Sequence, residues 1–492
     1  MDIILAIPPR IEDDYGYTPA AAAVLKGNVI SHGFTAKVMD FNAEIDELFQ
    51  TQPNIANAVN NFFNFNTFYH QQTWNILEKL IEQWAARIIS YNPKWVGLSV
   101  FSFNSQRATR LLSLQLKMQN PDIKIVIGGS GINTDRTFAE ELYAKNIIDA
   151  YIKGDGEESL IELLKGNTTY HGINGNPPAQ IKDLNNLAYP DYSDYTLANY
   201  TNKKGLQALP ITGSRGCVRN CTFCDINAAW PKFFYRSGAS IAGEIKHQVE
   251  TYGANAFRFT DSLTNGSMKA FRDMCYELAE YRRVSDIKFI WDAHFIIRSR
   301  RQMPPEDFDA MKESGCGTVW IGIESGSESV RNHMKKGYTE EDMQYTMEQL
   351  DRVGVKARLL MIIGYITETQ EDFQETLDLF EKWLPYLHNG TIEEVQLGAT
   401  LNLLPNTPLV DHLEEFNLIQ SHGHINDWIC TDNPDLDYKE RLRRRIIAQA
   451  HIERLGYPVF ESKNYVKQMF SQWEQVSNNA KNVGDAVASL NY

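Results

Sequence analysis

The sequence is poor in cysteine and contains no long apolar run. Six cysteines occur in 492 residues, and none of them precedes Cys217. Thiols this sparse do not build a disulfide-rich extracellular scaffold, so we expect a reducing, cytoplasmic location. The apolar start at residues 3–7 is too short to span a membrane, lacks a preceding basic segment and ends at Pro8-Pro9. We therefore expect neither export nor a membrane partner.

Positive charge is also scarce. The chain has 48 Lys and Arg residues against 62 Asp and Glu, and its net charge of -14 is spread along its length. Nucleic-acid binding needs a concentrated basic face, so nucleic acid is not an expected partner. With 43% hydrophobic residues, a chain of this length can bury two or three cores. These features fit a large soluble enzyme of several domains.

Three of the cysteines that are present form a cluster. Cys217, Cys221 and Cys224 follow a Gly-Ser-Arg-Gly turn. Thiolates at this spacing suit an iron–sulfur cluster or zinc, and three of them leave one iron of a four-iron cluster without a protein ligand. A structural zinc site needs a fourth ligand, and the nearest candidates, His247 and Cys275, fall in predicted helices. A disulfide is disfavoured because the thiols are too close together to pair regularly.

The segment from Cys217 to Cys224 resembles the signature Cys-x-x-x-Cys-x-aromatic-Cys of the radical S-adenosylmethionine (radical SAM) superfamily, with Phe223 as the aromatic residue. The resemblance implies a 4Fe-4S cluster whose metal ligands are Cys217, Cys221 and Cys224, with S-adenosylmethionine on the open iron. An electron from the cluster would cleave this cofactor and release a 5'-deoxyadenosyl radical. Phe223 would pack near the adenine.

Residues 1–165 alternate short apolar runs with helical patterns, which predicts an α/β, doubly wound (Rossmann-like) parallel sheet. An insertion at 61–68 precedes a predicted helix over 73–90. Ligands bind such a sheet beyond the carboxyl ends of its strands. The predicted strands are Ile3–Ile7, Ala36–Met39, Trp95–Val100, Ile123–Ile127 and Ala150–Ile152, and the loops beyond their carboxyl ends are Pro8–Thr18, Phe101–Ser105, Gly128–Asn133 and Gly154–Glu158.

Three segments in this order, Val96–Ser99, Ile127–Gly129 and Lys153–Glu158, resemble the cobalamin-binding domain that precedes some radical SAM cores. The resemblance implies cobalamin as a cofactor. The contacts that it implies are Ser99, Asn104, Gly128, Gly129, Gly154 and Glu157. Without the resemblance, the glycine pair is equally well explained by a structural turn after a strand.

One feature of many cobalamin proteins is missing. They offer the cobalt a histidine from an Asp-x-His-x-x-Gly loop, but residues 11–17 contain none. His32 is no substitute, because it ends a predicted helix, where a cation and a following glycine act as a cap. Radical SAM relatives commonly leave that face of the cobalt open, so cobalamin is not excluded. The lower cobalt ligand is not predicted.

A linker rich in Pro and Asn occupies residues 166–205. Six repeats of strand and helix over 206–405 then predict a partial (β/α)6 barrel, and residues 406–492 predict a mostly helical C-terminal region. Barrels of this kind gather reactive groups at the carboxyl ends of their strands. The predicted strands are Ala208–Thr212, Phe257–Thr260, Lys288–Asp292, Thr318–Glu324, Ala357–Gly364 and Glu394–Ala399, and the cysteine cluster follows the first.

The resemblance also implies cofactor contacts at the barrel strands, namely Asp261, Glu324, Ser325 and Arg358. Alternatives stay open for two of them. Asp261 or Ser262 would serve equally as a helix cap, and Arg358, like Arg298, as half of a surface ion pair. For Glu324 we prefer a ligand, because a buried carboxylate without a partner is costly.

The loop after the fifth barrel strand departs from the family pattern Gly-x-Pro-x-Glu-Thr. Here it reads Gly-Tyr-Ile-Thr-Glu-Thr over 364–369, so its shape is not predicted. The basic run Lys439–Arg445 predicts an amphipathic helix with a solvated face, or else an anion site. We expect Cys275, Cys316 and Cys430 to be buried structural thiols, and Cys430 is also a candidate active-site residue.

The family resemblance implies a cobalamin-dependent methyltransferase acting on an unactivated carbon of a small-molecule or peptide substrate. An external donor such as flavodoxin or ferredoxin would supply electrons. Two other functions stay open: a cobalamin-binding cyclase, rearrangement or oxidative enzyme without methyl transfer, and a non-catalytic iron–sulfur redox or sensing protein. A radical methylthiotransferase is excluded because no second set of cysteines precedes Cys217. Neither the substrate nor a catalytic side chain is predicted.

Overall fold

The computed structural model describes residues 1–9, 18–53, 71–134, 137–178, 180–200, 208–420 and 425–461, together with Tyr465 and Ser471. It divides into two compact units. The first, called the sheet unit here, comprises Met1–Pro210 and His247–Ala256. The second, called the barrel unit, comprises Ile211–Lys246 and Phe257–Tyr492.

The sheet unit is built on a parallel sheet with the strand order β2-β1-β3-β4-β5. This is a doubly wound order that reverses direction between β1 and β3, so the predicted fold class is confirmed. The strands are β1 Ile3–Ile7, β2 Ala36–Asp40, β3 Trp95–Ser99, β4 Lys124–Gly128 and β5 Ala150–Ile152. The helices are α1 Ala20–Ser31, α2 Asn42–Thr51, α4 Gln71–Ser90, α5 Phe103–Gln119, α6 Gly131–Thr134, α7 Phe138–Ala144 and α8 Gly156–Leu164. The insertion at 61–68 lies outside the described residues.

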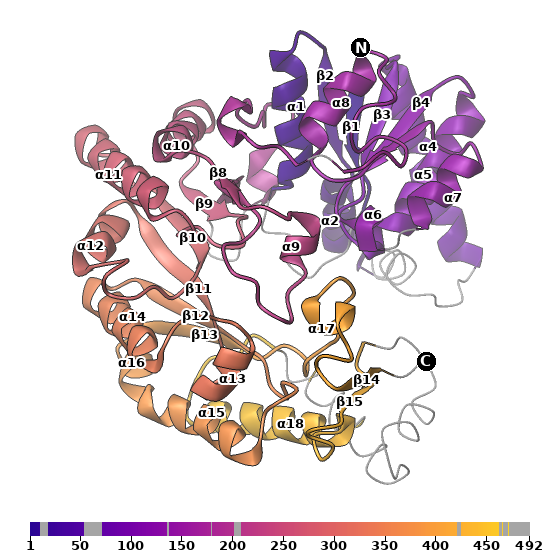
Figure 1. The fold of residues 1–492 in the computed structure, drawn as a ribbon. Coiled ribbons are helices and arrows are strands. Elements are labelled where there is room, and N and C mark those ends of the chain that lie inside the picture. The colour runs from indigo at the N-terminus through magenta and orange to yellow at the C-terminus, as the bar shows by residue number, and fades with distance from the viewer. Residues whose placement is uncertain are drawn as a thin grey trace. The chain divides into compact units, whose positions relative to one another are not determined.

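Alternate residues of β1 pack on opposite faces of this sheet. Ile3, Leu5 and Ile7 join one core with residues of α1 and α8. Ile4 and Ala6 join a second core with residues of α4 and α5. Side chains of consecutive strand residues point to opposite faces, and both faces are apolar, which is why the strand reads as a continuous hydrophobic run. Figure 1 shows the helices on the two sides of the sheet.

The Pro- and Asn-rich segment after α8 packs on the sheet unit. The ammonium of Lys26 in α1 is buried and lies 2.6 Å from the carboxylate of Asp194 and 3.2 Å from that of Asp191. The hydroxyl of Tyr200 donates to Asp40 at the end of β2, at 2.7 Å. Short 3-10 helices occur at Leu184–Asn186 and Leu197–Tyr200. Buried charge pairing thus fixes this segment against α1 and β2.

The six-stranded sheet has the order β13-β12-β11-β10-β9-β6, in which neighbouring strands follow one another along the chain. This order confirms a partial barrel. The strands are β6 Ala208–Ile211, β9 Ala256–Phe259, β10 Ile290–Phe295, β11 Cys316–Glu324, β12 Lys356–Met361 and β13 Ile392–Gln396. A short antiparallel pair, β7 Ser214–Arg215 and β8 Phe234–Tyr235, stands apart from it. The fifth strand ends at Met361, three residues earlier than predicted, because the apolar residues Ile362, which is partly buried, and Ile363, which is buried, continue past the end of the strand.

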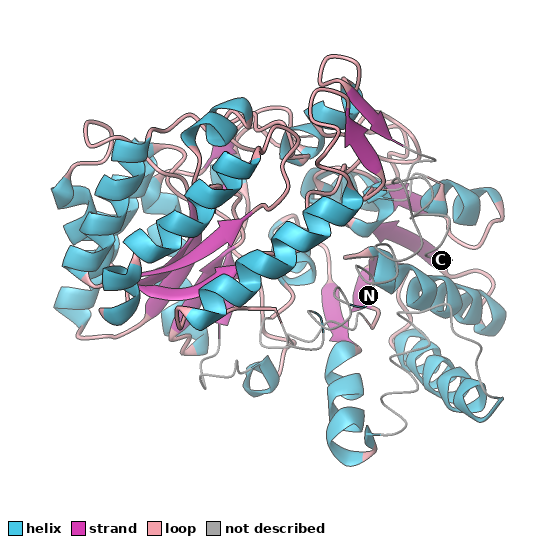
Figure 2. Ribbon diagram, turned by 90° about the horizontal axis from the view of Figure 1, so that it is seen from below, coloured by secondary structure: helices cyan, strands magenta, loops and turns pink. Residues whose placement is uncertain are grey.

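Helices cover the outer face of the barrel strands (Figure 2). The helices in this part of the chain are α9 Ile226–Ala229, which follows the cysteine loop, and α10 Gly238–Tyr252, α11 Met268–Ser285, α12 Pro305–Glu313, α13 Glu328–His333, α14 Glu340–Val353, α15 Gln370–Lys382 and α16 Leu384–His388. Ala293, Phe295, Ala357 and Leu359 are buried, whereas the residues between them on β10 and β12 are partly exposed. The alternation separates an apolar outer face from a more polar inner face.

The C-terminal region contains α17 Pro408–Asp411, β14 Leu418–Gln420, β15 Trp428–Cys430 and α18 Tyr438–Arg454. The antiparallel pair β14–β15 was not predicted. Helix α18 begins after Asp437, whose side chain caps it, as predicted. The expected solvated basic face is wrong: Arg441, Arg444 and Arg445 are buried, because backbone carbonyls and carboxylates accept from their guanidinium groups. No helix in the described part of the chain is long and apolar enough to cross a membrane.

Candidate functional site

The cysteine loop lies at the carboxyl end of β6, and Asp261 ties it to the end of β9. The Asp261 carboxylate accepts hydrogen bonds from the backbone N–H of Gly213 at 2.8 Å and from the hydroxyl of Ser214 at 2.9 Å. Burial raises the pKa of Asp261 to about 7, although these hydrogen bonds oppose the shift. The helix-cap alternative is wrong, since α11 begins at Met268 and is capped by Ser267. A cofactor contact for Asp261 stays a prediction.

Thr222, in the middle of the cysteine loop, anchors the loop to three other segments of the barrel unit. Its backbone N–H donates to the carbonyl of Met334 at 3.2 Å, and its carbonyl accepts from the N–H of Leu409 at 2.9 Å. Its hydroxyl lies 2.7 Å from the hydroxyl of Tyr365. The loop is therefore held by main-chain contacts on both sides.

The three thiols of this loop are free and half-buried. Burial raises the pKa of Cys224 to about 11, and the charges of Cys221 and Cys217 act in the same direction. Burial also raises the pKa of Cys221. Such thiols lose their protons when a metal binds them. No three His, Cys, Asp or Glu residues in the described ranges are grouped to hold one metal ion. A cluster that spreads its ligands over separate irons fits this donor set.

Glu324 ends β11 with a left-handed backbone, at φ 67°. Its carboxylate lies 2.8 Å from the ammonium of Lys336, and both side chains are largely buried. The expectation that Glu324 lacks a partner is therefore wrong; Lys336 sits twelve residues away, and no local pattern pairs them. Burial lowers the pKa of Lys336, but the charges of Glu324, Tyr338 and Cys221 together with the hydrogen bond to Glu324 outweigh burial and hold this pKa above its ordinary value. The Lys336 ammonium also lies 6.0 Å from the ring centroid of Phe223.

Ser325 follows Glu324 and is fully buried. Its hydroxyl oxygen accepts from the N–H of Ser327 at 3.1 Å and lies 3.3 Å from the hydroxyl of Thr376. These contacts shape the turn after β11. A direct cofactor contact for Ser325 stays a prediction.

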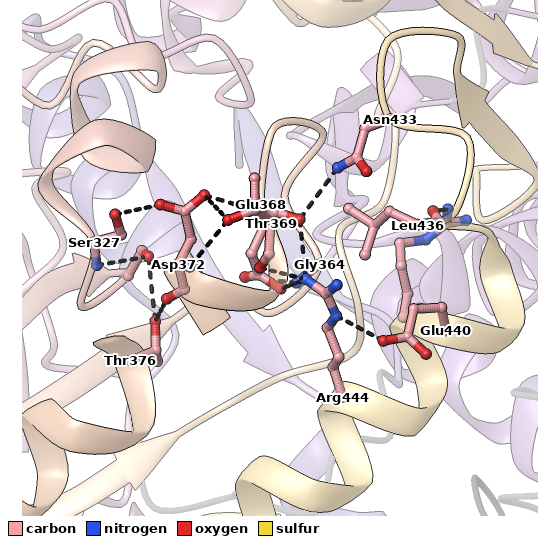
Figure 3. A network of polar contacts seen from close by, with 12 residues as sticks. Ser327, Gly364, Glu368, Thr369, Asp372, Thr376, Asn433, Leu436, Glu440 and Arg444 are labelled. Carbon is pink, nitrogen blue, oxygen red and sulfur yellow. Dashed lines mark hydrogen bonds and ion pairs between the residues drawn. The ribbon is translucent and has the colours of Figure 1, made fainter. Parts of the chain in front are cut away.

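The loop after β12 is closed by Glu368. Both carboxylate oxygens of Glu368 accept from the N–H of Gly364, each at 3.2 Å. Burial raises the pKa of Glu368 to about 7, while Arg444 of α18 opposes that shift. Figure 3 shows this carboxylate between Gly364 and the Arg444 guanidinium. The surviving Glu-Thr pair thus defines a loop whose proline is missing.

Arg358 lies in the middle of β12 and not at a strand end. Its Nε donates to Glu393 at 3.0 Å, and its guanidinium lies 5.3 Å from the ring centroid of Trp320. An ion pair, the alternative considered from sequence, is what the structure shows, although it sits inside the barrel and is largely buried. Arg298 instead donates to the carbonyls of Asn265 and Gly266 at 2.9 and 2.8 Å.

Sequence reasoning missed a row of polar side chains across the barrel strands. His294, Trp320, Arg358 and Glu394 are direct register partners on successive strands. The imidazole of His294 stacks on the indole of Trp320, with ring centroids 5.1 Å apart. Its Nδ1 is buried, and none of the described residues is its hydrogen-bond partner. The signal was the alternation of polar and apolar residues in β10, which overlaps only partly with the strand predicted there.

In the sheet unit, the predicted residues end neighbouring strands. Ser99 ends β3 and Gly128 ends β4, where they are register partners. Gly129 has φ 117°, and a Cβ there would lie 2.5 Å from the carbonyl oxygen of Val100. Gly154 follows β5, and Glu157 is buried in the first turn of α8. The glycine turn has a structural cause of its own, so these residues stay predictions as cofactor contacts.

Two other predictions from sequence concern residues that lie partly outside the described structure. Residues 11–17, the loop without histidine, lie outside the described residues, as does the side chain of Asn104. None of the four loops expected at this edge contains a histidine. The described loops offer main chain and small side chains. They fit a large ligand held by its shape and give cobalt no imidazole.

The other cysteines are buried. Cys275 and Cys316 lie in the barrel unit, in α11 and β11. Cys430 ends β15 within a hydrophobic cluster that contains Trp428 and Tyr365. The expected burial is confirmed for all three, whereas the structural role and the alternative active-site role of Cys430 stay predictions. The Nδ1 of His32, at the end of α1, donates to the carbonyl of Asn28 at 2.8 Å, as a capping residue does.

Models of two protein families match the chain. The B12 binding domain matches residues 13–164, and the radical SAM superfamily matches residues 211–380. These ranges contain β2, β3, β4 and β5 of the first unit, and β9, β10, β11 and β12 of the second. A radical SAM domain implies a 4Fe-4S cluster and S-adenosylmethionine, and a B12 binding domain implies cobalamin.

Curated relatives are distant and longer than the matched part. An uncharacterized methyltransferase of Pyrococcus horikoshii is 25% identical over 316 residues, which cover 60% of this chain and 66% of that protein. An anaerobic magnesium-protoporphyrin IX monomethyl ester cyclase of Rubrivivax gelatinosus is 24% identical, over 63% of this chain and 58% of that protein. A putative methylthiotransferase of Methanocaldococcus jannaschii is 28% identical, over 56% and 60%. The chain thus spans less than two thirds of each of these relatives.

Solved structures share the fold. The cobalamin-dependent S-adenosylmethionine radical enzyme OxsB with aqua-cobalamin bound has a TM-score of 0.66 at 16% identity, covering 96% of this chain and 71% of that one. The radical S-adenosylmethionine methyltransferase TsrM of Kitasatospora setae has a TM-score of 0.62 at 18% identity, covering 86% and 78%. Both family models, the three-thiol loop at the first barrel strand and the doubly wound sheet agree. The chain therefore contains a segment that matches the B12 binding domain, residues 13–164, ahead of a segment that matches the radical SAM superfamily, residues 211–380.

Proposed function

We propose that this protein is a radical SAM enzyme that cleaves S-adenosylmethionine reductively and, with cobalamin, transfers a methyl group to an unactivated carbon. The observation that carries the proposal is the cysteine loop at the carboxyl end of β6. Three half-buried thiols lie in one turn, and the Glu324–Lys336 ion pair is close enough for its charges to act on the thiol of Cys221. The names of the methyltransferases among the relatives and solved structures support the choice of reaction.

When bound, the cluster would supply the electron that cleaves the sulfonium, and cobalamin would carry the methyl group. The chain's own residues would hold these cofactors and orient them. Cys217, Cys221 and Cys224 would each give one thiolate, while Thr222 and Asp261 keep their loop in place. Glu324 would accept hydrogen bonds from the ammonium or the ribose hydroxyls of S-adenosylmethionine, and Lys336 would hold its carboxylate in place through the ion pair.

A radical reaction without methyl transfer is the second candidate. It is favoured by the relative named as a cyclase, which matches 63% of this chain. The two candidates share the cluster and its cleavage reaction and differ in the fate of the methyl group.

The partners belong to the proposal as well. We propose a small-molecule or peptide substrate and an external electron donor such as flavodoxin or ferredoxin. We also propose a cytoplasmic location, which the six free cysteines support because reducing compartments keep thiols unpaired.

The test is anaerobic reconstitution with iron, sulfide and cobalamin, followed by optical spectra and product analysis. The proposal expects a cluster spectrum, bound corrin, and both 5'-deoxyadenosine and S-adenosylhomocysteine as products. 5'-Deoxyadenosine without S-adenosylhomocysteine or methylated product would replace methyl transfer with the second candidate. A reduced cluster that leaves S-adenosylmethionine intact would overturn both and favour a redox or sensing protein.

A further inference from the structure

Two buried arginines of the C-terminal helix α18, Arg441 and Arg444, contact the loop 364–369 that follows β12. A single nitrogen of Arg444, Nη1, donates to the carboxylate of Glu368 at 3.0 Å, to its carbonyl at 2.9 Å and to the carbonyl of Thr369 at 2.9 Å. Arg444 is 6% exposed and Glu368 is 0% exposed. Arg441, one turn earlier, packs on Gly364, where a Cβ would lie 2.8 Å from its Cγ. The positive φ of 78° at Gly364 leaves room for this approach.

The C-terminal region holds this loop at a second point. The side-chain amide of Asn433 donates to the carbonyls of Ile366 and Glu368, at 3.2 and 3.1 Å. Figure 3 shows Asn433 and Arg444 meeting Glu368 from opposite sides. The carbonyl of Glu368 and one of its carboxylate oxygens thereby accept from residues of the C-terminal region. The conformation of the loop depends on a segment about seventy residues further along the chain.

The same network continues into the turn after β11. Asp372, in the first turn of α15, accepts from the N–H and hydroxyl of Thr369, each at 2.9 Å. Its other carboxylate oxygen accepts from the hydroxyls of Ser327 at 2.6 Å and Ser329 at 2.8 Å. The N–H of Gly326 donates to the hydroxyl of Thr376 at 3.0 Å. Figure 3 shows these contacts of Asp372 and Thr376 beside the contacts of Glu368.

The network therefore joins three parts of the barrel unit: α18, the loop 364–369 and the turn 324–327. The last two leave the carboxyl ends of neighbouring strands, β12 and β11. Buried charged hydrogen bonds hold their partners in one geometry, because any displacement leaves a charge without a partner in a low dielectric.

We propose that Arg444 is a positioning residue of the S-adenosylmethionine site, which sets the loop 364–369 and, through Asp372, the turn that carries Glu324. This inference rests on the proposed function, because that function makes Glu324 a contact of S-adenosylmethionine. Arg444 itself touches neither cluster nor cofactor in this scheme.

The test compares Arg444→Gln with Arg443→Gln. Arg443 directly precedes Arg444 on α18 and is half-exposed. Among the described residues it pairs with Glu440, a carboxylate that Arg444 also contacts. Both changes remove one positive charge from the same turn, but only Arg444→Gln removes the hydrogen bonds of the guanidinium to Glu368 and Thr369. Arg444→Lys is added because it keeps the charge and loses the planar group of donors.

Two measurements are made on each variant. Equilibrium dialysis of the cluster-loaded protein gives the Kd of S-adenosylmethionine, and hydrogen–deuterium exchange of the iron-free protein reports on residues 361–376. We expect Arg444→Gln to raise the Kd at least tenfold and to speed exchange in this segment, with iron content unchanged. Arg444→Lys should fall between it and the wild type. Arg443→Gln should match the wild type in both measurements.

A Kd and exchange pattern of Arg444→Gln equal to those of Arg443→Gln would overturn the inference while leaving the proposed function intact. Failure of the wild-type protein to bind S-adenosylmethionine would instead overturn the proposed function. Should Arg444→Gln not fold, the pair Glu368→Gln with Arg444→Met removes both buried charges together. In that variant a raised Kd with normal iron content supports the inference, and a wild-type Kd contradicts it.

Discussion

The two sheets of this molecule end in edges of different chemistry. At the carboxyl edge of the barrel strands, the residues are thiols, a buried carboxylate and an ammonium, each held by contacts from other segments. At the corresponding edge of the five-stranded sheet, the described residues expected to contact the cofactor are three glycines, Ser99 and Glu157, and the turn at Gly129 is set by close packing of main chain. A metal cluster needs soft side-chain ligands at fixed places, whereas a large planar cofactor can be held by shape and main chain. We therefore expect substitutions at the barrel edge to remove ligands or charges, and substitutions at the edge of the five-stranded sheet to disturb main-chain packing.

The largest effect is expected from Cys221→Ser. A hydroxyl is a poor substitute for a thiolate on iron, so cluster iron should be lost and cleavage of S-adenosylmethionine should fall to the level of iron-free protein. Cobalamin binding, measured optically, should persist because it belongs to the other unit. Cys430→Ala is the control and should keep its iron. Loss of both cofactors in Cys221→Ser would show that the two edges are not independent.

Lys336→Met tests the ion pair at the barrel edge. It leaves the Glu324 carboxylate buried without its cation, which costs about 3 kcal/mol of unfolding free energy, as broken buried pairs do. Urea unfolding of the iron-free protein measures this cost. The double change Lys336→Met with Glu324→Gln should recover most of the stability and still bind S-adenosylmethionine weakly. Full recovery of binding in the double variant would contradict the assigned role of Glu324.

Gly129→Ala tests the edge of the five-stranded sheet. The added Cβ meets the Val100 carbonyl at 2.5 Å with φ at 117°, so we expect a loss of about 2 kcal/mol and weaker cobalamin binding. Gly166→Ala is matched, because its φ is 92° but a Cβ there has no neighbour within 4 Å. It isolates backbone strain from the clash. Normal cobalamin binding in Gly129→Ala would remove this turn from the cobalamin site.

The smallest effect is expected from Arg358→Lys. Arg358 is paired with Glu393 in the middle of β12, so the change should cost about 1 kcal/mol of stability and leave the Kd of S-adenosylmethionine within twofold. Thermal unfolding and equilibrium dialysis measure the two quantities. A tenfold rise in Kd at unchanged stability would restore the cofactor role that the family resemblance implied for this residue.

Much of the fold was readable from sequence because its signals are local. Strands β1 and β5 agree residue for residue with the prediction, since short apolar runs between turn residues need no distant information. The cap Asp437 likewise marked the start of α18. The cysteine motif carried its own spacing. In contrast, β12 was predicted too long, because its apolar residues stay buried after the ladder ends.

Errors arose where a distant partner decided the outcome. Glu324 was expected to lack a cation, but the chain returns Lys336 to it after α13. The arginines of α18 were expected in solvent, but Glu368 and several carbonyls accept from them. Asp261 was considered a helix cap, yet it binds the loop that precedes the cysteines. In each case the residue type was noticed and its partner was not.

The sequence by itself determined the class of chemistry: three thiols in one turn, and strand and helix alternation in both halves. Only the tertiary structure decided which charges are paired and which segments hold the cofactor loops. The physical reason is that thiol spacing and apolar periodicity are properties of neighbouring residues. A buried ion pair such as Arg444 with Glu368 joins residues 76 apart, and it exists only once the fold has brought them together.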